Sequence, residues 1–212
     1  MASVRQGQRF LLVGNRLCID FANSSAPLGK ADPLASWANL VDFLEAAGAV
    51  DHLRGNVLRR MGDSRASRAA LDQARRLRQT MLRALPAMAL GKPVSGEHIH
   101  AINRLLAAAE SFPQLTEARV GRYRLELRLR RDGPRHALLP IARSAAELIA
   151  EGPAAPVRRC ANPKCVLYFY DDSRNGLRRW CSMQACGNRR KVATFSKRQR
   201  ALALRRGTSQ PG

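Results

Sequence analysis

The sequence predicts a mainly α-helical protein of the α+β class, in which a multihelical N-terminal domain with a β-hairpin precedes a small cysteine-rich module. Of the 212 residues, 45% are apolar but only 5% are aromatic. The core therefore consists mostly of Ala, Leu and Val, a composition that favours helices. Long segments repeat apolar residues at helical spacing, and one segment alternates apolar with charged residues. Four of the five cysteines lie within residues 160–186.

Apolar spacing predicts the first elements. Residues 9–13 (RFLLV) are predicted as a short strand, and the alternation at 17–23 fits either a strand or a short helix. Asp32-Pro33 predicts the start of a helix, because Pro is tolerated in the first helical turn. Apolar residues at helical spacing follow until Gly48, which is a typical helix stop. The sequence also allows a second short helix at 56–61.

The central segment, residues 64–90, is predicted as one long helix because its Ala/Leu/Arg pattern contains no Gly and its only Pro is near the end. Ser95 is expected to cap a further helix that ends near residues 111–113. Its inward-facing residues are predicted to be Ile99, Ile102, Leu105 and Leu106.

The spacing of the apolar residues then changes from helical to alternating, which predicts a hairpin. The segment YRLELRLRR, residues 123–131, alternates almost strictly, as a half-exposed strand does. Asp132-Gly133 is typical of a tight turn, so the hairpin is predicted at about 122–140. A last helix is predicted at 144–151.

The Gly/Pro-rich residues 152–156 predict a stiff linker and a domain boundary. We therefore expect a mainly helical domain at 1–152, a second module at 157–204 and a frayed tail at 205–212.

The cysteine spacing predicts one structural zinc ion. Cys160 and Cys165 enclose four residues, fifteen residues follow, and Cys181 and Cys186 again enclose four. Two such loops can direct four thiolates at one point, which is the tetrahedral shell of a structural zinc site without an open position. Disulfides and unliganded cysteines are the alternatives. Cys18 lies apart on an apolar stretch and is interpreted as a small buried hydrophobic residue.

Charge predicts a polyanionic partner. The formal net charge is +21, and residues 157–212 carry 14 basic and two acidic residues, a net of +12. A local excess of this kind is typical of nucleic-acid binding or of an anionic surface. An arginine-rich composition also follows from a GC-rich genome. No stretch reaches the roughly 18–20 consecutive apolar residues of a membrane span, and the N-terminus lacks a signal-peptide pattern, so we expect a cytoplasmic protein without membrane contact.

No catalytic pattern is present, so the chain is not expected to be an enzyme. The four histidines form no HExxH motif, and there is no P-loop or Gly-x-Ser-x-Gly sequence. Asp20 and Asn23 form a polar pair within an apolar stretch. Such a pair is either a buried hydrogen-bonded brace or part of a small-ligand pocket, so both are candidate ligand-binding residues.

The cysteine segment resembles the CGNR zinc finger, a small treble-clef-like module of bacterial proteins similar to transcription regulators. The resemblance rests on the two Cys-x4-Cys pairs and on an ordered set of residues between and after them. These are Phe169, Asp171, Ser173, Arg174, Asn175, Arg178, Arg179, Trp180 and the run Cys186-Gly187-Asn188-Arg189 with Lys191. Asp172 departs from the family pattern, which often has a small hydroxyl residue there.

The N-terminal part is similar to the ABATE domain, which usually precedes this finger. Its LxxDFxN-type opening matches residues 17–23, LCIDFAN. Together the two resemblances imply a stress-related transcriptional regulator with a DNA-binding finger.

We therefore expect a zinc-dependent DNA-binding regulator whose N-terminal domain senses a small ligand or a partner. The alternative is an RNA-binding or protein-interaction module in which the zinc is purely structural. Some basic residues of the finger could instead neutralise the zinc–thiolate charge. The candidate nucleic-acid-binding residues are Arg174, Arg178, Arg179, Arg189, Arg190, Lys191, Lys197 and Arg198.

Overall fold

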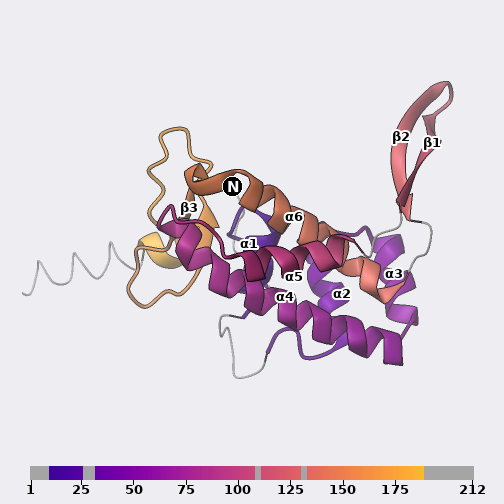
Figure 1. The fold of residues 1–212 in the computed structure, drawn as a ribbon, viewed down its shortest axis with the longest axis horizontal. Coiled ribbons are helices and arrows are strands. Elements are labelled where there is room, and N and C mark those ends of the chain that lie inside the picture. Colours follow the sequence, from indigo (N-terminus) through magenta and orange to yellow (C-terminus); the bar gives the residue numbers. More distant parts are fainter. Residues whose placement is uncertain (1–9, 26–31, 108–110, 130–132, 189–212) are drawn as a thin grey trace, which may run out of the picture.

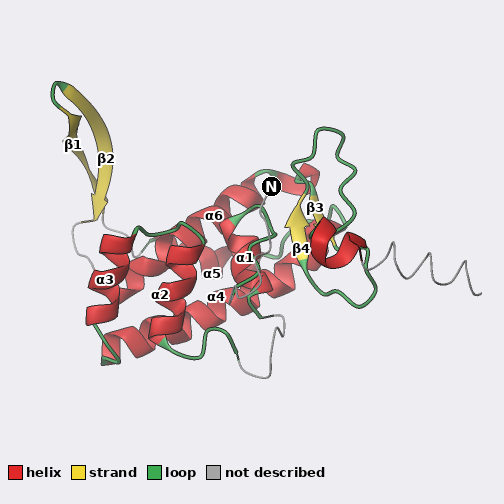
Figure 2. Ribbon diagram, turned by 180° about the vertical axis from the view of Figure 1, so that it is seen from behind, coloured by secondary structure: helices red, strands yellow, loops and turns green. Residues whose placement is uncertain are grey.

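The computed structural model describes residues 10–25, 32–107, 111–129 and 133–188. A helical body occupies most of the molecule, a β-hairpin projects from one end, and a small cysteine-rich module lies at the other end (Figure 1). The body contains α1 (Leu17–Asn23), α2 (Trp37–Ala46), α3 (His52–Arg60), α4 (Arg65–Ala89), α5 (Gly96–Leu106) and α6 (Leu139–Ala150). The predicted mainly helical fold with a hairpin and a small C-terminal module is confirmed (Figure 2).

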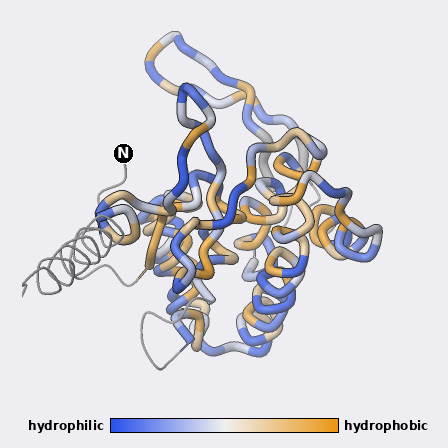
Figure 3. The backbone as a smooth tube through the Cα atoms, turned by 90° about the vertical axis from the view of Figure 1, so that its left-hand side faces the viewer, coloured by the Kyte–Doolittle hydropathy of each residue, from blue (hydrophilic) through white to orange (hydrophobic). Residues whose placement is uncertain are grey.

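The core lies between α4 and the helices packed against it. α1, α2 and α5 contact α4, and α6 contacts both α1 and α5. The side chains of Phe21, Leu44 and Met81 are completely buried there. Figure 3 shows hydrophobic and hydrophilic residues following one another along the helical coils of the body. Burying one such side chain contributes about 1.5–3 kcal/mol, so the shared apolar faces hold the helices together.

The first segment of the chain differs from the predicted strand. Residues 10–16 form an extended loop, and Asn15 has a φ of 58°. This loop is hydrogen-bonded to the C-terminal module: the Tyr170 N–H donates to the carbonyl oxygen of Gly14. Residues 17–23, which fitted a strand or a helix, form α1. All residues from Cys18 to Asn23 are buried, which is why their polarity pattern was ambiguous.

Side chains of Ser36, Asp51 and Ser64 cap the starts of α2, α3 and α4. α2 begins at Trp37, where Ser36 caps the N–H of Asn39, so the predicted start at Asp32-Pro33 is wrong. The Asp32 carboxylate instead accepts hydrogen bonds from the Leu34 N–H and from Arg78. The stop at Gly48 is confirmed, since Gly48 has a φ of +68° just after the helix end.

The hairpin is present, but its predicted position at 122–140 is wrong. β1 (Ser111–Arg119) pairs antiparallel with β2 (Arg122–Leu129), so the partner strand precedes the alternating segment. Gly121, with a φ of +71°, supplies the turn. Residues Pro134–Leu138 form a short 3₁₀ helix that leads into α6 instead of a returning strand. The predicted helix end near 111–113 is also wrong, because α5 ends at Leu106.

The C-terminal module contains a second small antiparallel pair, β3 (Val157–Arg159) and β4 (Tyr168–Tyr170), and one helical turn, Met183–Gly187. Val157 is buried in the core of the helical body. The part of the module beyond residue 188 and the predicted tail at 205–212 lie outside the described residues. Within the described part of the chain, no helix is both long and apolar enough to cross a membrane.

Candidate metal centre and its seam with the helical body

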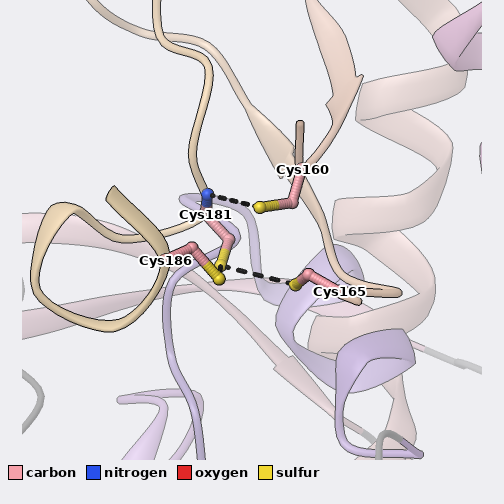
Figure 4. A group of neighbouring side chains, drawn as sticks. All are labelled: Cys160, Cys165, Cys181 and Cys186. Carbon is pink, nitrogen blue, oxygen red and sulfur yellow. Dashed lines mark hydrogen bonds between the residues drawn. The ribbon is translucent and has the colours of Figure 1, made fainter. Parts of the chain in front are cut away.

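The four predicted cysteines meet at one point. The Sγ atoms of Cys160, Cys165, Cys181 and Cys186 all lie within 4.8 Å of one another (Figure 4). The Sγ atoms are 3.8 Å apart for Cys165 and Cys181, and 3.6 Å apart for Cys181 and Cys186. Zn–S bonds of about 2.3 Å in a tetrahedron place sulfurs about 3.8 Å apart. The cluster therefore fits one Zn²⁺ with four cysteine ligands.

The thiols need a cation in order to ionise together. Burial, and then the charge of Cys160, raise the pKa of the Cys165 thiol to about 11. The pKa of the Cys181 thiol is also raised, first by burial and then by the three neighbouring thiols. A bound dication removes this repulsion, because zinc holds its cysteine ligands as thiolates. The Cys181 N–H and the Asn162 side-chain amide donate to Cys160 Sγ and Cys186 Sγ, each at 3.4 Å, and offset part of the negative charge.

Asp171 shapes the loop that connects the two cysteine pairs. Its buried carboxylate accepts hydrogen bonds from the Ser173 N–H and hydroxyl and from the Arg178 N–H, and it pairs with Arg158 Nε at 3.0 Å. Burial alone would raise the pKa of Asp171, but these donors and the Arg158 charge lower it. The carboxylate therefore acts as an organiser of residues 171–178 and orients one arginine.

Arg178 is partly buried, and its guanidinium makes its contacts within the module and with the N-terminal loop. Its guanidinium donates to the carbonyl oxygens of Val13, Tyr170, Trp180 and Cys181. The group also stacks 4.3 Å from the centroid of the Phe169 ring. By contrast, the predicted nucleic-acid-binding residues Arg174 and Arg179 are exposed. The remaining predicted residues, Arg189, Arg190, Lys191, Lys197 and Arg198, lie outside the described residues.

The contact between residues 10–23 and residues 157–188, called the seam below, joins the module to the helical body. The side chain of Asn23 accepts from the Tyr168 N–H at 3.0 Å and donates to the Tyr168 carbonyl at 2.8 Å. Asn15 donates to Asp172 at 2.7 Å, and Arg16 stacks on the Tyr170 ring. These partners lie about 150 positions apart in the chain, so local sequence patterns gave no sign of them.

Asp20 holds the loop that precedes α1. It is 9% exposed, and its carboxylate accepts from the Gly14 N–H at 2.7 Å. Burial raises the pKa of Asp20 to about 6, although the hydrogen bonds from Gly14 and Val13 and the charge of Arg178 act in the opposite direction. The two predicted ligand-binding residues thus bond to opposite sides of the seam: Asp20 to the N-terminal loop and Asn23 to β4.

We expect Asn23→Ala to lower the free energy of unfolding by about 2–3 kcal/mol, because it removes both partners of the Tyr168 backbone within a partly buried strand. Urea unfolding followed by circular dichroism measures this. Asn103→Ala, a truncation at an exposed helical position, is the control and should change stability by less than about 0.5 kcal/mol. Equal effects of the two substitutions would contradict a role for Asn23 in the seam.

We expect Asp20→Asn to flatten the pH dependence of stability between about pH 4 and pH 6. Because the folded-state pKa of about 6 exceeds the ordinary 3.8, the folded chain binds more protons in this window. Its stability therefore falls as the pH rises, by up to about 3 kcal/mol. The asparagine keeps an oxygen for the Gly14 N–H but does not titrate. Thermal unfolding of both chains across this pH range checks the difference, and parallel curves would show that Asp20 does not cause the slope.

Comparisons with known families agree with this architecture. The profile of the ABATE family, described as "putative stress-induced transcription regulator", matches residues 15–152. The profile of the CGNR zinc finger matches residues 157–199. Both resemblances seen in the sequence are therefore confirmed. No curated protein matches the chain.

Proposed function

The chain belongs to the ABATE family and carries a CGNR zinc finger, and from this we propose that it is a zinc-dependent, DNA-binding transcription regulator. In this proposal the finger holds DNA, and the helical body senses a small ligand or a protein partner. The zinc is structural, because its four ligand positions are filled by cysteines and leave no place for a reacting water.

The distribution of charge carries the proposal. Residues 157–212 have a net charge of +12, and the described finger exposes basic side chains from several of its segments. Exposed arginines bind phosphate oxygens with two parallel hydrogen bonds, which gives affinity for a nucleic-acid backbone. The exposed basic residues in the described finger are Arg158, Arg159, Lys164, Arg174 and Arg179.

The seam supports a sensing role for the helical body. Asp20 and Asn23 both lie on α1, and they bond to the N-terminal loop and to β4. A ligand or partner that shifts α1 would move the finger with it, because these hydrogen bonds connect the two. In this proposal Asp20 and Asn23 transmit binding from the helical body to the finger.

The test is retention of genomic DNA fragments by the purified zinc-loaded protein across a salt series, followed by sequencing of the retained fragments. If about six side chains contact phosphate, the logarithm of the binding constant should fall with the logarithm of salt concentration at a slope near −5. Selective retention that is lost on chelation supports a sequence-specific regulator. Retention of RNA in preference to DNA, or of neither, would favour the alternative of an RNA-binding or protein-interaction module.

We further expect the triple substitution of Arg189, Arg190 and Lys191 by Ala to weaken DNA binding on every fragment and to reduce the salt slope. The matched control replaces Arg65, Arg76 and Arg83, three exposed arginines of α4, and removes the same net charge from the helical body. Binding that survives the first triple change intact would show that this surface has been assigned wrongly.

A further inference from the structure

A cavity opens at the seam beside the metal centre, and the zinc ligand Cys181 is one of its lining residues. Its volume is about 680 Å³, within the range of small-molecule sites. The N-terminal segment contributes Val13 and Asn15 to its wall, and residues between 172 and 184 of the finger contribute the rest. A molecule bound there touches both halves of the chain.

One wall is apolar and is kept accessible. Leu177 and Met183 are 73% and 50% exposed, and Trp180 lies beside them in the lining. A Cβ atom at Gly187 would lie 2.7 Å from Met183 Sδ and 3.2 Å from Trp180 Cδ1. Glycine at this position therefore lets both side chains pack against the backbone of the second cysteine loop. Together they form a surface suited to a flat aromatic ring.

The polar groups of the cavity define the rest of the ligand. The guanidinium carbon of Arg179 lies 5.4 Å from the centroid of the Trp180 ring, and the side chain is exposed. Its guanidinium is free to bind an anionic group with two hydrogen bonds. Asp172 is the one carboxylate in the lining. One of its oxygens accepts from Asn15, and the carboxylate retains further capacity to accept N–H donors.

We propose that this cavity binds a mononucleotide. The base packs on Trp180, the phosphate pairs with Arg179, and an amino group of the base donates to Asp172. Aromatic side chains stack on bases in this way, and carboxylates accept hydrogen bonds from their amino groups. Because Asp172 also accepts from Asn15, a ligand bound to Asp172 joins the contact between the N-terminal segment and the finger loop, and its binding tightens the seam. This adds an effector class to the proposed function, with the effector bound at the seam and not within the helical body, and its regulatory role rests on that function.

The test uses GMP as the probe, since guanine carries an exocyclic amino group. Equilibrium dialysis of the full-length, zinc-loaded chain should show one saturable site. Arg179→Ala should weaken GMP binding about tenfold or more. Guanosine, which lacks the phosphate, should bind more weakly than GMP and should bind equally to both proteins. Arg159→Ala removes an exposed charge of the finger outside the cavity lining and should leave GMP binding unchanged.

Each outcome decides the proposal. Absence of saturable binding up to about 1 mM, or an equal effect of the Arg159 and Arg179 substitutions, overturns it. A single-stranded oligonucleotide that displaces GMP at much lower concentration also overturns it, because the occupant is then part of a strand. DNA retention measured on the same samples separates the two ideas. GMP binding without DNA retention would contradict only the proposed DNA-binding function. DNA retention without GMP binding would contradict only the proposed nucleotide site.

Discussion

Removal of the zinc is expected to lower the stability of the whole chain by at least about 5 kcal/mol, and not only that of the finger. Structural zinc supplies roughly 10–16 kcal/mol of apparent binding free energy in small fingers, and this binding is coupled to folding. The finger is built into the helical body here. Val157 is part of the main core, Tyr168 and Tyr170 pack against it, and Val13 of the N-terminal loop is buried in the finger's own core. Loss of the metal therefore disturbs both sides of the seam.

Urea unfolding followed by far-ultraviolet circular dichroism, with and without a chelator, measures this effect, because most of the signal comes from the helical body. Cys181→Ser should reproduce the effect of the chelator and should abolish the stoichiometric zinc. Cys18→Ala is the matched control. Its thiol is completely buried in the body and does not belong to the four-cysteine cluster, so it is not a zinc ligand. That variant should keep one zinc per chain and the response to chelation. A helical body that unfolds at the same urea concentration without zinc would show that the two parts fold independently.

Local chemistry explains why the zinc ligands could be predicted from the sequence. Four thiols at short regular spacing within 27 residues are typical of a zinc site, and the loops between them are short enough to bring them together. The longer helices were also predictable, though not all of their ends, since α2, α4 and α5 each bury a stripe that repeats at helical spacing. α4 shows this best, because Ser64 caps it and its apolar face extends to Met88.

Pairing between distant residues explains what the sequence did not reveal. Gly121 and Gly133 flank the alternating strand, and either could form the turn of a hairpin. Which of them does so depends on which neighbouring segment pairs with that strand. That partner, β1, contains Pro113 and shows little alternation of its own, so the downstream segment was favoured. The structural role of Arg178 was equally hidden. One of its acceptors, the carbonyl oxygen of Val13, lies 165 positions away in the chain.

Arg178 and its neighbour Arg179 are expected to behave in opposite ways when each is replaced by alanine, although both belong to the predicted nucleic-acid-binding set. Arg178→Ala should cost about 3 kcal/mol of stability, because four carbonyl oxygens lose a charged donor and the Phe169 ring loses its stacked guanidinium. Arg179→Ala should change stability by less than about 0.5 kcal/mol, since the side chain is exposed. Arg178→Lys should restore little of the lost stability, because an ammonium group cannot reach all the acceptors that are spread around a planar guanidinium.

Urea unfolding and DNA retention measured on the same variants separate structural loss from surface loss. The Arg179 variant should bind DNA more weakly, with a smaller salt slope, while its unfolding midpoint stays in place. For the Arg178 variant, any loss of DNA retention should accompany a lowered urea unfolding midpoint. This loss of retention should diminish under conditions in which the variant is fully folded. Weakened retention by a fully folded Arg178→Ala protein would instead mean that this guanidinium contacts DNA directly. In that case its four carbonyl contacts would have to open when DNA binds, and the seam between the finger and the helical body would change on binding.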